Sequence, residues 1–118
     1  MKHLVFVYNA DSGLFNTMAD IAHKIISPST YSCQLCALTH SYFTARKEWT
    51  PFLDELDAEL EFLHRDELQK KYGIKEITLP VILLKNDAQL STWISTKEIN
   101  DCQSIDTLKL MISEKLKD

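Results

Sequence analysis

Hydrophobic residues near the start of the chain form a continuous run rather than an alternating pattern. The run His3-Leu-Val-Phe-Val-Tyr8 ends in the polar cluster Asn9-Ala-Asp-Ser-Gly13. Such a run is typical of a central parallel strand covered on both faces, and the polar cluster is its exit turn. Hydrophobic residues then recur at helical spacing from residue 14 to residue 26, and Ser27-Pro28 ends that pattern. This part of the chain therefore predicts a βα unit.

Residues 29–58 have no clean period, and we interpret them as an irregular insert between the first helix and the second strand. The insert contains the string Cys33-Gln-Leu-Cys36. Near its end, Thr50-Pro51 predicts a short helix, with the threonine as cap and the proline at the first helical position.

Regular patterns return after the insert. The segment Glu59-Leu-Glu-Phe-Leu-His-Arg65 alternates with period two, which places Leu60, Phe62 and His64 on one face of a strand. The segment Asp66-Glu-Leu-Gln69 has the capping-box spacing of a short helix that ends at Gly73.

The last third of the chain predicts a hairpin and a helix. A strand over Leu79-Pro-Val-Ile-Leu-Leu84 turns at Asn86-Asp87 into a second strand, Leu90-Ser-Thr-Trp-Ile94. Ser95 and Glu98 have the spacing of a further capping box. The final helix starts after Ser104 and carries its hydrophobic residues on one stripe, which consists of Ile105, Leu108, Met111, Ile112 and Leu116.

This order of elements resembles the thioredoxin fold, in which a βαβ half is followed by a ββα half. The resemblance covers residues 2–26 and 59–117, and it implies a single thioredoxin-like α/β domain over residues 1–118. We expect a mixed sheet of about four strands flanked by helices, with the strands at Leu4 and Leu60 parallel and adjacent. Leu79-Pro80 stands where that fold keeps a cis-proline, so the resemblance implies a cis peptide before Pro80.

Several strings also resemble a small uncharacterised bacterial protein family. They are Tyr8-Asn-Ala-Asp-Ser-Gly13, Ser27-Pro-Ser-Thr-Tyr31, Cys33-x-Leu-Cys36-x-Leu-Thr39 and Phe62-Leu-His64-x-Asp-Glu67. Members of that family carry no assigned activity beyond a loose GTPase label. The two glycines of this chain form no G-x-x-x-x-G-K-[ST] loop to hold phosphates, so the sequence contradicts that label.

Composition excludes some classes of partner. The chain has 118 residues, 45% of them hydrophobic and 25% charged, which is ordinary for a globular domain. The formal net charge of −4 argues against broad contact with nucleic acid or with an anionic membrane. No run approaches the ~20 apolar residues of a membrane span. The odd count of three cysteines fits a disulfide framework poorly, and we expect a cytoplasmic location.

The strongest candidate for chemistry is the pair Cys33 and Cys36. Its spacing is that of a thiol–disulfide oxidoreductase, which acts on a protein or a small thiol. In thioredoxin-like enzymes the catalytic dithiol follows the first strand and opens the first helix, where backbone N–H groups lower the pKa of the nucleophilic thiol. In this chain Ala10-Asp11-Ser12-Gly13 holds that place, and the cysteine pair comes after the first helix.

Two other interpretations of the pair stay open. A closed zinc site needs two more ligands besides Cys33 and Cys36, and His40 and His23 are the candidates. Alternatively, the two cysteines are structural thiols that anchor the insert in a partner-binding module without a cofactor. Cys102, just before the last helix, is interpreted as structural.

A second candidate site lies at the ends of the parallel strands. Asp11 and Ser12 follow the first strand, His64 and Asp66 follow the second, and Pro80 is expected opposite them. Ligands of open α/β sheets bind outside the carboxyl ends of the strands. The helix behind Ser12 is a candidate for binding a small anion, and His64 with Asp66 is a candidate general acid/base pair. The simpler alternative is that Asp11, Ser12 and Asp66 are helix caps and that His64 is structural.

Overall fold

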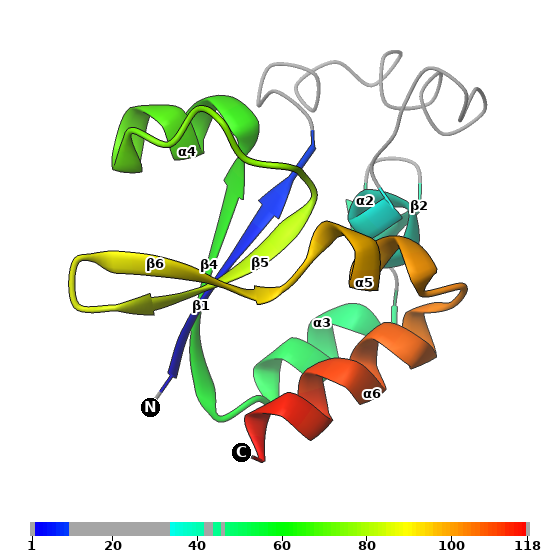
Figure 1. Ribbon diagram of the computed structural model, residues 1–118. Helices are drawn as coiled ribbons and strands as arrows, with labels where there is room; N and C mark the ends of the chain where they lie inside the picture. Colours follow the sequence, from blue (N-terminus) through cyan, green and yellow to red (C-terminus); the bar gives the residue numbers. More distant parts are fainter. Residues whose placement is uncertain (1, 10–33, 42–43, 46, 118) are drawn as a thin grey trace.

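The computed structural model describes residues 2–9, 34–41, 44–45 and 47–117. At its centre lies a four-stranded mixed sheet in the order β4-β1-β5-β6 (Figure 1). The strands are β1 (Lys2–Tyr8), β4 (Ala58–His64), β5 (Val81–Asn86) and β6 (Gln89–Ile94). β1 runs parallel to β4 and antiparallel to β5, and β5 and β6 form an antiparallel hairpin. The expected α/β class and mixed sheet are confirmed, including the parallel pairing of Leu4 with Leu60. The predicted helix over residues 14–26 lies outside the described residues.

The continuous hydrophobic run becomes β1 because both faces of this strand are buried. Leu4 and Phe6 belong to one hydrophobic cluster, called the larger cluster below. Val5 and Val7 belong to a second, smaller cluster on the opposite face of the sheet. All four side chains are fully inaccessible to solvent. The middle of a strand with neighbours on both sides and cores on both faces has no position at which a polar side chain reaches water.

Helices cover the two faces of the sheet unequally (Figure 1). The larger cluster receives side chains from α2 (Gln34–Thr39), α3 (Trp49–Asp54), α5 (Thr96–Asp101) and α6 (Ile105–Leu116). The smaller cluster receives Leu68 from α4 (Arg65–Tyr72), together with residues of the segment that connects α4 to β5.

The described part of residues 29–58 is more regular than predicted. It contains α2, α3 and a two-stranded sheet of β2 (His40–Ser41) and β3 (Thr44–Ala45). These elements are too short to produce a readable period. Packing stabilises α2, because Leu35 and Leu38 are buried in the larger cluster beside α5 and α6.

Helix α3 starts earlier than the cap signal predicted. The helix begins at Trp49 after Glu48, so Thr50 is not its cap and Pro51 is its third residue. Trp49 is almost fully buried, and its ring lies edge-on against Phe6 with 6.0 Å between centroids. Burial of this ring outweighs the local cap preference. Pro51 is tolerated because the first N–H groups of a helix have no partner within the helix.

The hairpin and the last helices agree closely with the sequence patterns. Ser95 and Glu98 form the expected capping box, in which each side chain accepts from the backbone N–H of the other residue. Ser104 caps α6 by accepting from the N–H of Thr107. β5 begins at Val81 rather than at Leu79, because Pro80 has no N–H to contribute to a ladder.

The two remaining boundaries follow from backbone conformation. Gly73 ends α4 in the left-handed region at φ 71°, as predicted for a glycine after a helix. Asp87 turns the hairpin at φ 58°, a conformation that Asp tolerates better than most residues do. In the part of the chain that the structure describes, no helix has the length and apolar character needed to cross a membrane.

Candidate functional site

The carboxyl ends of β1 and β4 lie side by side, as the strand-end hypothesis requires. Tyr8, the last residue of β1, pairs with His64, the last residue of β4, and their rings lie 5.7 Å apart. On the other side of β1, Val7 pairs with Val81, so the adjacent Pro80 also lies at this end of the sheet. The peptide between Leu79 and Pro80 is cis, as the fold resemblance implied, and Pro80 is buried.

Of the five residues predicted for this site, the structure describes three. His64 and Pro80 come to the same end of the sheet, and Asp66 lies in the first turn of α4. Asp11 and Ser12 lie outside the described residues. Anion binding at the helix behind Ser12 therefore stays a prediction.

The cap of α4 differs from the prediction. The N-cap is His64 rather than Asp66, because the helix begins at Arg65, directly after the strand. The third helical residue is therefore Glu67. Its Oε1 accepts from the backbone N–H of His64 at 2.8 Å and lies 2.5 Å from the Nδ1 of the imidazole. Glu67 is not among the residues predicted for this site, although the spacing His64-x-x-Glu67 is that of a capping box with histidine in the place of serine.

The carboxylate of Glu67 orients the imidazole of His64. A hydrogen bond from the His64 side chain, followed by one from its backbone, lowers the pKa of Glu67 below its usual value of 4.5. Arg65 extends this polar end of the sheet by donating to the Oδ1 of Asn9 at 3.5 Å. A half-buried imidazole held by a carboxylate is a geometry that supports proton transfer.

The cysteine pair is only partly described. Cys36 belongs to α2, and Cys33, three positions earlier in the sequence, lies outside the described residues. The helix that contains Cys36 is anchored by buried Leu35 and Leu38, and the Thr39 hydroxyl donates to the Leu35 carbonyl at 2.8 Å. The expectation of an irregular segment around CQLC is thus wrong for residues 34–39, which are helical.

The alternative zinc site stays a prediction. Cys33 and His23 lie outside the described residues, and His40 is known only as the first residue of the short strand β2. Within residues 2–9, 34–41, 44–45 and 47–117, no three side chains of metal-binding type converge on one point.

Cys102 is a structural thiol, as predicted. The side chain is almost fully buried in the larger cluster, and its Sγ lies 3.4 Å from the carbonyl oxygen of Glu98. Burial raises the pKa of the Cys102 thiol, and the nearby carboxylates of Asp101 and Glu98 raise it further. A buried neutral thiol of this kind reacts slowly.

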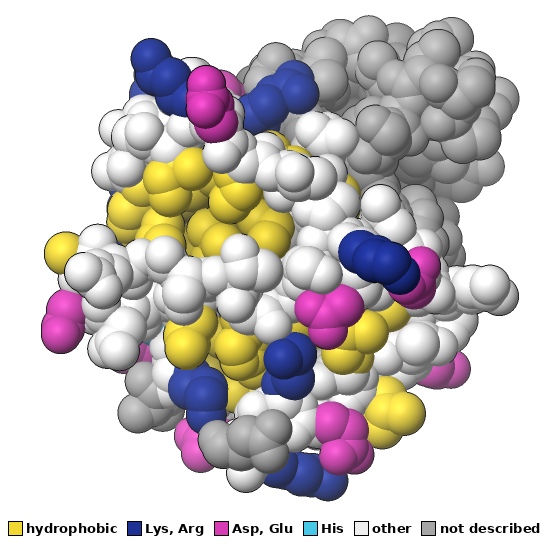
Figure 2. Space-filling model, in the orientation of Figure 1, with side chains coloured by type: hydrophobic (Ala, Val, Ile, Leu, Met, Phe, Trp, Pro, Cys, Tyr) yellow, Lys and Arg dark blue, Asp and Glu magenta, His cyan; other side chains and the backbone are white. Residues whose placement is uncertain are grey.

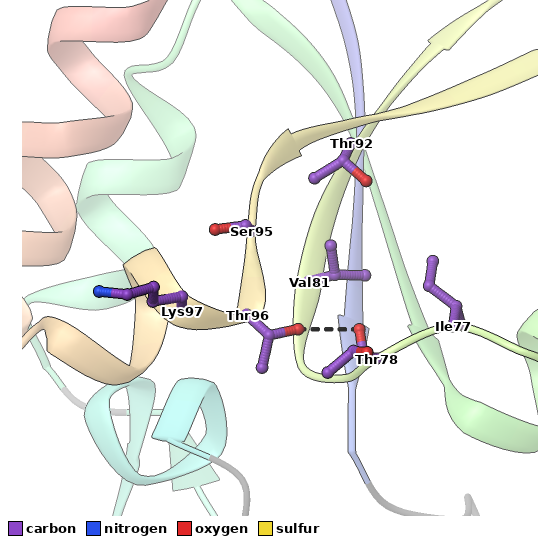
Figure 3. A pocket seen from close by; sticks show the side chains of 7 residues that line it. All are labelled: Ile77, Thr78, Val81, Thr92, Ser95, Thr96 and Lys97. Carbon is purple, nitrogen blue, oxygen red and sulfur yellow. Dashed lines mark hydrogen bonds between the residues drawn. The ribbon is translucent and has the colours of Figure 1, made fainter.

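A pocket of about 350 Å³ opens beside the hairpin, and none of the sequence motifs indicated it (Figure 3). Its lining comes from three segments: the connection before β5, the hairpin strands, and the start of α5. The lining residues are Ile77, Thr78, Val81, Thr92, Ser95, Thr96 and Lys97. The Thr96 hydroxyl donates to the Thr78 carbonyl at 2.8 Å and so fastens the start of α5 to the segment that leads to Pro80.

Comparisons with protein-family models, with curated proteins and with solved structures find no match for this chain.

Proposed function

We propose that this chain is a thioredoxin-like thiol protein in which Cys33 and Cys36 form a redox-active or partner-binding pair. The observation that carries the proposal is the strand order β4-β1-β5-β6, with β1 parallel to β4 and antiparallel to β5, because this arrangement favours the thioredoxin-like assignment on which the role of the pair depends. Cys36 lies in α2, and the described helix Gln34–Thr39 contains no acidic residue that would oppose ionisation of a thiol.

The surroundings of α2 also support the proposal. α2 packs against α5, and the first residue of α5, Thr96, is bonded to Thr78 just ahead of the cis peptide at Pro80. The strand order is a feature of the thioredoxin fold, and Pro80 stands at the position where that fold keeps a proline, so both favour a thioredoxin-like assignment.

The proposed chemistry is thiol–disulfide exchange with a protein or a small disulfide. The Cys33 thiolate attacks one sulfur of the partner disulfide, and the other sulfur leaves as a thiolate. Cys36 then attacks the mixed disulfide and releases the second partner sulfur. The chain ends with a Cys33–Cys36 disulfide, and the partner gains two electrons and two protons.

The test is a count of reactive thiols in the native protein, with a chromogenic disulfide as the reagent and metal analysis of the same sample. We expect two of the three cysteines to react fast and the third, Cys102, to react only after unfolding. The variant Cys102→Ser keeps both fast thiols, whereas Cys33→Ser with Cys36→Ser removes them. Three slow thiols would show that the pair is structural. One equivalent of zinc released together with the pair would show the alternative, a zinc-stabilised module.

A further inference from the structure

β6 is an edge strand whose outer side pairs with no other strand of the described chain. Alternate residues of an antiparallel strand point their N–H and C=O groups toward one neighbour, and the residues between them point toward the other side. Edge strands usually carry a charge or a proline that blocks further pairing. The sequence of β6, Gln-Leu-Ser-Thr-Trp-Ile, has neither. A shift of register against β5 makes Trp93 the extra residue of a bulge, so the regular part of the edge is Gln89–Thr92.

The 350 Å³ pocket lies directly beside this edge. Thr92 of β6 lines it together with Ile77 and Val81 (Figure 3). Leu90, two residues before Thr92, packs on the smaller cluster, to which Val81 also belongs, so Leu90 and Thr92 share one face of the sheet. Figure 2 shows hydrophobic side chains at the surface between α4 and the hairpin. The edge thus combines exposed backbone groups with an adjacent hollow that has an aliphatic floor.

We propose that this edge binds a second copy of the chain by antiparallel pairing of β6 with β6 across a two-fold axis at Ser91. In that register Ser91 lies opposite itself, and Leu90 of each copy lies opposite Thr92 of the other. Each Leu90 then stands on the pocket side of the sheet, at the mouth of the other copy's pocket and near Ile77 and Val81. The two sheets join into one continuous sheet of eight strands.

Charge supports the choice of edge, and it permits a second copy as the occupant. In a two-fold pairing every charge near the axis faces a charge of the same sign, which destabilises the pair. The opposite edge, β4, carries Glu59 and Glu61 and would repel itself. β6 carries no charged residue, and its Ser91 and Thr92 are exposed. Of the two edges of this sheet, β6 is therefore the one that can pair with a second copy of itself without charge repulsion.

The test is sedimentation of the full chain over a range of concentrations. We expect the mass to rise from 13.6 kDa toward twice that value as concentration increases, because an interface of one short strand pair is small and dissociates on dilution. Ser91→Lys and Ser91→Glu each place like charges opposite each other, and each should weaken self-association by at least about fivefold. Mixing the two variants places Lys opposite Glu and should restore the dimer. Gln103→Lys, an exposed position outside β6, is the control for added charge.

Three results would overturn the proposal. The first is a wild-type chain that stays at 13.6 kDa at all concentrations, which would leave the edge to an extended segment of another protein. The second is a dimer that both Ser91 variants leave unchanged, which would place the interface elsewhere. The third is a failure of the mixed variants to associate, which would exclude pairing across Ser91. Because Ser91 is exposed, circular dichroism should show that both variants remain folded.

Discussion

One oxygen of Glu67 binds both the backbone and the side chain of His64, and it thereby connects the end of β4 to the start of α4. The sequence pattern predicted Asp66 as the cap of this helix, because an aspartate followed three residues later by glutamine fits the usual capping box. A histidine cap is uncommon, and the actual start of the helix depends on where β4 ends. Tertiary structure, rather than local preference, selects the cap.

Glu67→Gln should therefore lower the free energy of unfolding by roughly 0.5–2 kcal/mol at pH 7, the usual value of a helix cap. The folded chain holds the pKa of Glu67 below its usual value of 4.5. The contribution of Glu67 is then complete above that pH and is lost as the pH falls through the folded-state pKa. Urea unfolding of both proteins between pH 3 and pH 7 measures this difference.

The matched control is Glu76→Gln, which removes one exposed carboxylate from the connection after α4. The control should unfold like wild type at every pH. If Glu67→Gln loses no more stability than Glu76→Gln, the bond between Glu67 and His64 does not contribute to the free energy of unfolding.

At the scale of the secondary-structure elements, hydrogen bonds of the Glu61 side chain connect β4 to both β1 and α4. The Oε1 of Glu61 accepts from the Tyr72 hydroxyl at 3.0 Å and lies 3.0 Å from His3 Nε2, while Lys71 donates to its Oε2 at 2.6 Å. Burial alone would raise the pKa of Glu61, but hydrogen bonds from Lys71, Tyr72 and His3 together lower it. In the described chain α4 is the only helix that covers the smaller cluster. The hydrogen bonds of Glu61 therefore hold this helix against the sheet.

Glu61→Ala should cost about 1–3 kcal/mol of stability, because it leaves half-buried donors without their acceptor. Glu59→Ala, two residues earlier on the same face, removes a mostly exposed carboxylate and should cost less than about 1 kcal/mol. Urea unfolding compares the two variants, and hydrogen exchange should show faster opening of α4 in the Glu61 variant alone. Equal losses in both variants would contradict this role of Glu61.

Prediction from the sequence was good for long or strongly patterned elements. β1, the hairpin, α5 and α6 each carry either a period or a cap that their own residues specify, such as Ser95 with Glu98 or the stripe from Ile105 to Leu116. α2 has six residues and owes its helical form to the burial of Leu35 and Leu38 against other helices. A single sequence contains no local signal of such packing.

At the scale of the whole molecule, the larger cluster contains most of the buried hydrophobic side chains of the described chain. Leu108→Ala in α6 removes a fully buried side chain and should cost about 2–5 kcal/mol. Leu110→Ala changes the same residue type on the same helix, where the side chain is 61% exposed, and should stay within about 0.5 kcal/mol of wild type. Thermal unfolding measures both. Similar effects in the two variants would mean that α6 does not pack as described.

The candidate site was predictable only in part, because some of its residues come from segments that lie far apart in the sequence. Parallel pairing brings the carboxyl ends of β1 and β4 together, and the element order sufficed to predict that. The pocket beside β6 collects Thr78, Thr92 and Thr96 from three segments, and no pair of them has a spacing that marks a site. Only the three-dimensional arrangement of the hairpin and α5 reveals it.

The position of β1 in the middle of the sheet has a consequence for synthesis on the ribosome. Lys2 pairs with Ala58, and Val7 pairs with Val81, so β1 is made well before both of its neighbours and waits for them during translation. Until then its hydrophobic side chains and both of its backbone edges are exposed, which makes the nascent chain prone to aggregation. Chains stalled before residue 58 should therefore depend on chaperones, and folding should start only after the hairpin has left the exit tunnel.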